Sequence, residues 1–133
     1  MKHPGPLAGV RVVDLTAMVM GPYCTQIMAD MGADVIKVEP PAGDTTRYVS
    51  AAPEPGMAGV FVNVNRGKRS VVLDLRSDAG RDALGALVAR CDVFIHSMRA
   101  RAIAALGFGY PEVATSAPSW PTRWPALPPC TPP

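Results

Sequence analysis

Short apolar runs alternate with amphipathic stretches along the first hundred residues of this chain. Residues 10–15 (VRVVDL) and 34–39 (DVIKVE) have the apolar character of buried strands. Between them, apolar residues recur at i, i+3, i+4 and i+7, which predicts a helix with one apolar side. These residues are Cys24, Ile27, Met28 and Met31. Pro22 stands in the first turn of this predicted helix and Gly32 at its end, positions typical of the two residue types.

A second unit of the same kind follows. Residues 70–75 (SVVLDL) predict a buried strand, Ser77 can cap the next helix, and residues 92–96 predict a fourth strand. The helix between these strands repeats the same apolar spacing at Leu84, Leu87, Val88 and Cys91. Residues 100–106 predict a short helix, whereas residues 60–65 (VFVNVN) favour a short strand or an irregular segment.

Two strand–helix–strand units in series predict an α/β fold with a parallel, Rossmann-like sheet. Such sheets bind their ligands at the carboxyl ends of the strands. A binding site is therefore expected in the loops that follow Leu15 and Glu39.

Composition narrows the class of protein. A chain of 133 residues with 48% apolar and 18% charged residues suits one globular domain. A formal charge of +2 does not indicate nucleic acid or a membrane surface as a partner. Three widely spaced cysteines make no metal-binding pattern, and no signal peptide or membrane span is evident. We expect free thiols, no bound metal and a cytoplasmic location.

The pattern changes at Ala114. Residues 114–133 hold seven of the fifteen prolines and both tryptophans, and proline at this density blocks helices and strand pairing. Two explanations are open: a proline-rich docking tail in polyproline II form, or a change of reading frame. The second is favoured, because the change interrupts a helix that begins at Tyr110. We therefore divide the chain into a folded part, 1–113, and a disordered tail, 114–133.

Three ordered blocks of residues carry a family resemblance. The first consists of GVRVVDLT at 9–16, GPYC at 21–24, ADMGADVIKVE at 29–39 and GDTTR at 43–47. The second is NRGKRS at 65–70 with LDLR at 73–76, and the third is DVFIHS at 92–97 with LG at 106–107. Over residues 7–113 the chain resembles the N-terminal part of the class III CoA transferases, a family that also contains alpha-methylacyl-CoA racemases.

The resemblance implies an incomplete enzyme. Members of this family move CoA from an acyl-CoA thioester to a carboxylic acid through an enzyme aspartyl-CoA intermediate. The nucleophilic aspartate corresponds to a position beyond Val113, and no acidic residue follows Glu112 here. The resemblance thus implies the N-terminal part of the family's large domain, with no catalytic residue in this chain. It also implies CoA or acyl-CoA as a substrate, no permanently bound cofactor, and an interlocked homodimer for the complete protein.

Eight residues align with the family's CoA-binding positions. They are Ala17, Met18, Val19, Leu73, Arg76, Ser97, Met98 and Arg99. The Arg76 guanidinium could meet a phosphate, or it could be a solvated surface charge. Asp14 is expected to be a structural acid, and Cys24 and Cys91 to be core thiols. A catalytic role for His96 is not favoured, because no partner stands at a suitable spacing.

Two other functions remain open on the sequence. One is a non-enzymatic CoA- or nucleotide-binding module whose proline-rich tail binds a partner. The other is the corresponding part of a racemase.

Overall fold

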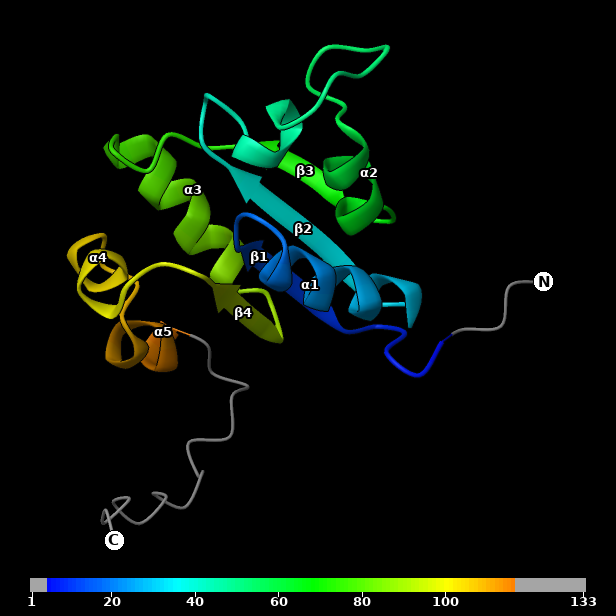
Figure 1. The fold of residues 1–133 in the computed structure, drawn as a ribbon. Coiled ribbons are helices and arrows are strands. Elements are labelled where there is room, and N and C mark those ends of the chain that lie inside the picture. The colour runs from blue at the N-terminus through cyan, green and yellow to red at the C-terminus, as the bar shows by residue number, and fades with distance from the viewer. Residues whose placement is uncertain (1–4, 117–133) are drawn as a thin grey trace, which may run out of the picture.

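The computed structural model describes residues 5–116, which form a four-stranded parallel sheet with helices on both faces (Figure 1). The predicted α/β fold with a Rossmann-like sheet is confirmed. The elements are β1 (Arg11–Leu15), α1 (Met20–Asp30), β2 (Asp34–Glu39), the 3-10 helix η1 (Thr45–Tyr48), α2 (Gly59–Asn65), β3 (Arg69–Val72), α3 (Asp78–Val88), β4 (Val93–His96), α4 (Ala100–Ala105) and α5 (Tyr110–Ser116). No helix in residues 5–116 has both the length and the apolar character needed to cross a bilayer.

The strands lie in the order β3-β2-β1-β4, and all pairs are parallel. The chain runs outward from β1 to β3 and then returns to the other side of β1, so the strand order reverses between β1 and β4. Because all four strands are parallel, their carboxyl ends lie at one edge of the sheet, where doubly wound sheets bind ligands.

One apolar cluster fills the space between the sheet and α3. Val13 and Val38 from the sheet pack with Leu84, Val88 and Cys91, and Leu84 is fully buried. The predicted apolar face of α3 is thus confirmed. So is its cap, since Ser77 Oγ accepts a hydrogen bond from the Gly80 amide at 3.1 Å. On the opposite face, a smaller cluster packs beside α1.

The predicted orientation of α1 is wrong. Ile27 and Met31 are exposed, as is Cys24, so this thiol is not in the core. The helix instead turns Thr25 toward Asp14 of β1, and both Thr25 and the adjacent Gln26 are almost fully buried. The physical reason is a buried carboxylate beneath the helix, described below, which needs hydrogen-bond donors that an apolar face does not supply.

Residues 60–65 also differ from the sequence prediction, because they belong to helix α2. Phe61 and Val64 lie three residues apart on its buried side, and Asn65 Nδ2 donates to the Phe61 carbonyl at 2.9 Å. Packing of these two side chains therefore overrides the strand preference of a segment rich in valine. At the other end, α5 runs through Ala114 to Ser116, and the rest of the predicted tail lies outside the described residues.

Candidate functional site

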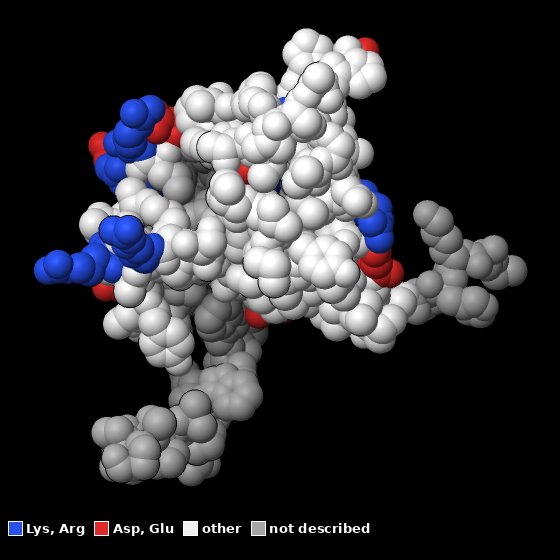
Figure 2. All heavy atoms as spheres, in the orientation of Figure 1, with Lys and Arg blue, Asp and Glu red and all other residues white. Residues whose placement is uncertain are grey.

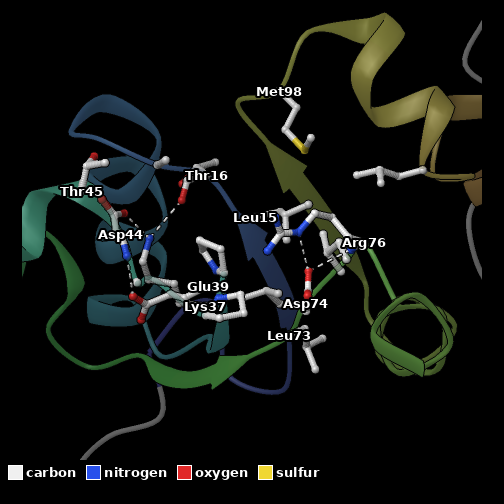
Figure 3. A pocket seen from close by; sticks show the side chains of 17 residues that line it. Leu15, Thr16, Lys37, Glu39, Asp44, Thr45, Leu73, Asp74, Arg76 and Met98 are labelled. Carbon is white, nitrogen blue, oxygen red and sulfur yellow. Dashed lines mark hydrogen bonds and ion pairs between the residues drawn. The ribbon is translucent and has the colours of Figure 1, made fainter. Parts of the chain in front are cut away.

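A pocket of about 490 Å³ opens at the carboxyl edge of the sheet. It takes residues from beyond the end of each of the four strands, including both loops that the sequence indicated. Its lining residues are Leu15, Thr16, Ala17, Lys37, Val38, Glu39, Pro40, Pro41, Gly43, Asp44, Thr45, Leu73, Asp74, Leu75, Arg76, Met98 and Leu106. Figure 3 shows the polar side chains Thr16, Lys37, Glu39 and Asp44 on one side, and Asp74 and Arg76 on the other.

Arg76 is the cation at the rim of the pocket. Its Nε lies 3.1 Å from Asp74 Oδ1, yet its side chain is 87% exposed. The Arg76 backbone amide donates to the same oxygen at 3.1 Å. These bonds from the Arg76 backbone and side chain lower the pKa of Asp74. The guanidinium is therefore oriented by Asp74 while most of its donors still face solvent.

Four of the eight predicted binding residues line the pocket, namely Ala17, Leu73, Arg76 and Met98. The other four stand beside it. Ser97 Oγ accepts from the Ala17 amide at 3.0 Å, which joins the end of β4 to the loop after β1. Met18 is half exposed with a left-handed φ of 68°. Val19 and Arg99 occupy the N-cap positions of α1 and α4. Their role as CoA contacts stays a prediction.

Three ion pairs with buried carboxylates lie at the pocket or next to it, and the sequence reasoning missed this arrangement. Lys68 pairs with Asp14 at 3.0 Å, Lys37 with Asp44 at 2.9 Å, and Arg47 with Glu39 at 2.6 Å. We call these six residues the buried charge network. The signal was present in the first motif block, where the predicted strand 34–39 carries Lys37 and Glu39 among its apolar residues. A charge within a buried strand requires a partner, so such residues predict ion pairs.

Glu39, the member of this network at the end of β2, accepts four hydrogen bonds. Its Oε1 accepts from Arg47 and Ser70, and its Oε2 accepts from Arg47 and from the Asp44 amide. Burial opposes ionisation of the carboxyl group, but hydrogen bonds from Arg47, Ser70 and Asp44 outweigh it and lower the pKa of Glu39 from 4.5 to about 2. Arg47 also lies 3.7 Å above the Phe61 ring, a cation–π contact that connects η1 to α2.

Lys37 projects from the same strand toward two loops. Its Nζ donates to the Thr16 carbonyl at 3.0 Å and lies 2.9 Å from Asp44 Oδ2. Asp44 also caps η1, because its Oδ1 accepts from the amide and the hydroxyl of Thr46. Burial raises the pKa of Asp44, but the bonds from Lys37 and Thr46 lower it by more, so the carboxylate is held ionised.

Asp14 holds the start of the loop after β1. Its Oδ1 accepts from the Thr16 amide and hydroxyl, and its Oδ2 from Thr25 Oγ1 and Lys68 Nζ. Burial lowers the pKa of Lys68, an effect that Asp14 opposes. With all its partners internal and no exposed surface, Asp14 has the structural role that the sequence predicted.

His96 ends β4 with its ring 5.8 Å from that of Phe94. Within the described residues, no three His, Cys, Asp or Glu side chains lie close enough together to hold a metal ion.

Comparison with known proteins gives consistent matches over this region. A sequence profile described as CoA-transferase family III matches residues 7–119. The succinyl-CoA:mesaconate CoA-transferase of Haloarcula hispanica is 47% identical over 110 residues, covering 80% of this chain and 28% of that protein. The human succinyl-CoA:glutarate CoA-transferase is 36% identical over 119 residues, covering 89% of this chain and 27% of that protein.

Solved structures of related proteins have a similar fold over the same region. A CAIB/BAIF family protein from Brucella suis superimposes with a TM-score of 0.81 at 37% identity, covering 87% of this chain and 32% of that one. The protein Rv3272 from Mycobacterium tuberculosis gives a TM-score of 0.79 at 37% identity, covering 86% and 32%. The chain therefore spans less than a third of the length of these relatives.

Proposed function

Because this chain belongs to CoA-transferase family III, we propose that it is the N-terminal, CoA-binding part of a protein that moves CoA from an acyl-CoA thioester to a carboxylic acid. The observation that carries the proposal is the pocket at the carboxyl edge of the sheet. It lies where doubly wound sheets bind nucleotide ligands, and its lining comes from the ends of all four strands.

The pocket suits the nucleotide end of CoA. Leu15, Val38, Leu73 and Leu75 give apolar walls, against which a flat base can pack. Arg76 stands at the rim with its guanidinium largely exposed, and this planar group can bind two oxygens of one phosphate. We propose that Arg76 binds a phosphate of CoA while Asp74 orients its side chain.

The transfer itself is proposed to use a nucleophile outside these 133 residues. An aspartate attacks the thioester carbonyl and releases CoA thiolate, which leaves an acyl-aspartyl anhydride. The thiolate then attacks the aspartyl carbonyl, giving aspartyl-CoA and the free carboxylate of the donor. The acceptor carboxylate repeats the exchange and departs as its CoA thioester, so each hard step is divided into easier ones.

The buried carboxylates of this chain support that assignment. Asp14, Glu39 and Asp44 are each held by a lysine or arginine and by further hydrogen bonds, and none is more than 4% exposed. A carboxylate bound in this way is a weak nucleophile, because attack would strip it of its partners. No acidic residue follows Glu112 in the sequence.

Calorimetric titration of CoA into the 133-residue chain tests the proposal, after far-UV circular dichroism has shown the chain to be folded. We expect binding, and about a tenfold loss of affinity on Arg76→Ala, as for one charge-assisted phosphate contact. Arg101→Ala, which removes another exposed arginine that does not line the pocket, should leave the affinity unchanged. A folded chain that binds no CoA contradicts the proposal. Robust transfer of CoA by the chain alone contradicts an external nucleophile.

The exposed side of α1 supports a further part of the proposal, an interface with a second copy of the protein. Met20 is 79% exposed and Tyr23 51%, and the neighbouring helix α2 exposes Val60 and Val62. Figure 2 shows that Lys, Arg, Asp and Glu lie mainly at the margins of this face. An apolar surface with so little charge can pack against a second copy of itself without burying unpaired charges, as the symmetric contact of a homodimer requires.

A further inference from the structure

We propose that Lys37 is a positioning residue that ties together the two loops that wall the pocket, the loop after β1 and the loop after β2. Its Nζ donates to the Thr16 carbonyl in the first loop at 3.0 Å and pairs with Asp44 Oδ2 in the second at 2.9 Å. Figure 3 shows both interactions, and Thr16, Lys37 and Asp44 all line the pocket. The identity of the ligand that the pocket holds rests on the proposed function.

Lys37 is suited to hold the loops because its own position is fixed. It lies in β2, which pairs with β1 on one side and with β3 on the other. The loop after β2 contains Pro40, Pro41 and Gly43, the last with φ +77°, and belongs to no strand ladder. A side chain rooted in a central strand therefore sets the position of a loop that lacks support of that kind.

A second contact joins the same two loops but is weaker. Thr45 Oγ1 donates to Met18 Sδ at 3.1 Å, at an exposed site and to a sulfur, which is a poor acceptor. The contact through Lys37 is charge-assisted and buried, with Lys37 1% and Asp44 4% exposed.

The charge balance of the network argues that Lys37 positions the pocket without binding a charged ligand itself. The network contains three carboxylates and three cations, and each carboxylate has its own cation within 3.0 Å. The charge of Lys37 is therefore already neutralised by Asp44, whereas the exposed guanidinium of Arg76 can still bind a phosphate. The contribution of Lys37 to binding is the spacing of the two loops.

A double substitution separates this positioning role from the cost of an unpaired buried charge. In Lys37→Met/Asp44→Asn both charges are removed, so no buried ion is left unpaired, and the asparagine keeps an oxygen to accept from Thr46. The control is Arg69→Met/Asp34→Asn. That pair joins β2 to β3 with a separation of 2.6 Å, and neither residue lines the pocket or contacts its two loops.

Hydrogen exchange, read by mass spectrometry on the ligand-free chain, is the first measurement. We expect amides in residues 16–20 and 40–48 to exchange about tenfold faster in the Lys37 double variant than in the control, because both loops lose a shared anchor. Lys37→Gln/Asp44→Asn also removes both charges but leaves polar side chains at both positions, and it serves if the first double variant does not fold. Both loops should again exchange faster than in the control.

Calorimetry with CoA is the second measurement. The affinity should fall about tenfold in the Lys37 double variant and stay within about twofold of the unaltered chain in the control. Unchanged exchange in both loops overturns the inference. Faster exchange with undiminished affinity overturns the positioning role. If the unaltered chain binds no CoA, the proposed function fails, and the exchange data still decide whether Lys37 ties the loops together.

Discussion

Glu39→Gln should lower the free energy of unfolding by about 3 kcal/mol at neutral pH. The carboxylate is 2% exposed, and its partners lower its pKa from 4.5 to about 2. Each unit of this shift is worth about 1.4 kcal/mol of stability when the group is ionised. Since the folded pKa is the lower one, this stability is present above about pH 4.5 and is lost as the pH falls toward about 2. Glutamine carries no charge for Arg47 and does not titrate.

Urea denaturation followed by far-UV circular dichroism measures the free energy of unfolding, and repeating it over a range of pH gives the pH dependence. The gap between the unaltered chain and Glu39→Gln should be widest at neutral pH and should narrow steadily below about pH 4.5. Asp30→Asn is the control, because Asp30 also pairs with an arginine, Arg66, but both side chains are about half exposed. Its cost should stay below about 1 kcal/mol. A loss below about 1 kcal/mol for Glu39→Gln, or a gap that does not change with pH, would refute this reasoning.

Three further outcomes are expected. Gly80→Ala should destabilise the chain by about 1–3 kcal/mol in the same assay, because its Cβ would stand 2.1 Å from the Asp74 carbonyl oxygen. Iodoacetamide should label the exposed Cys24 at least about tenfold faster than Cys91, because burial raises the pKa of the Cys91 thiol. Peptide mass spectrometry measures both labelling rates, and equal rates would show that Cys91 is accessible. Ile27→Asp should weaken self-association measured by light scattering, and a chain that stays monomeric at high concentration would exclude the α1 interface.

The sequence predicted the sheet and α3 well because their signals are local. Apolar runs specify β1 and β2, and Ser77 caps α3 where a hydroxyl can reach the first turn. The orientation of α1 was not predictable in this way. Its apolar repeat is real, but the helix turns Thr25 toward the sheet because Asp14, eleven residues earlier in the chain, needs a donor. The spacing of apolar residues within a helix gives no information about a buried charge elsewhere in the chain.

The location of the pocket followed from topology, since parallel strands bring their carboxyl ends to one edge. The buried charge network could not be predicted in this way, because its partners meet only in the folded chain. Lys68 and Asp14 lie 54 positions apart in the chain. The motif residues Lys37, Glu39 and Arg47 carry the family resemblance in the sequence. The structure adds their contacts: Lys37 binds Thr16 and Asp44, and Glu39 pairs with Arg47.

Titration of CoA into the isotope-labelled chain, followed by amide NMR shifts, tests the central claim most directly. We predict that the largest shifts fall on Ala17, on the loop around Asp44 and on Leu73 to Arg76, which meet at the carboxyl edge of the sheet. Shifts confined to the opposite end of the strands, around Arg11 and Arg90, or no shifts at all in a folded chain, would contradict the assignment of this pocket to CoA.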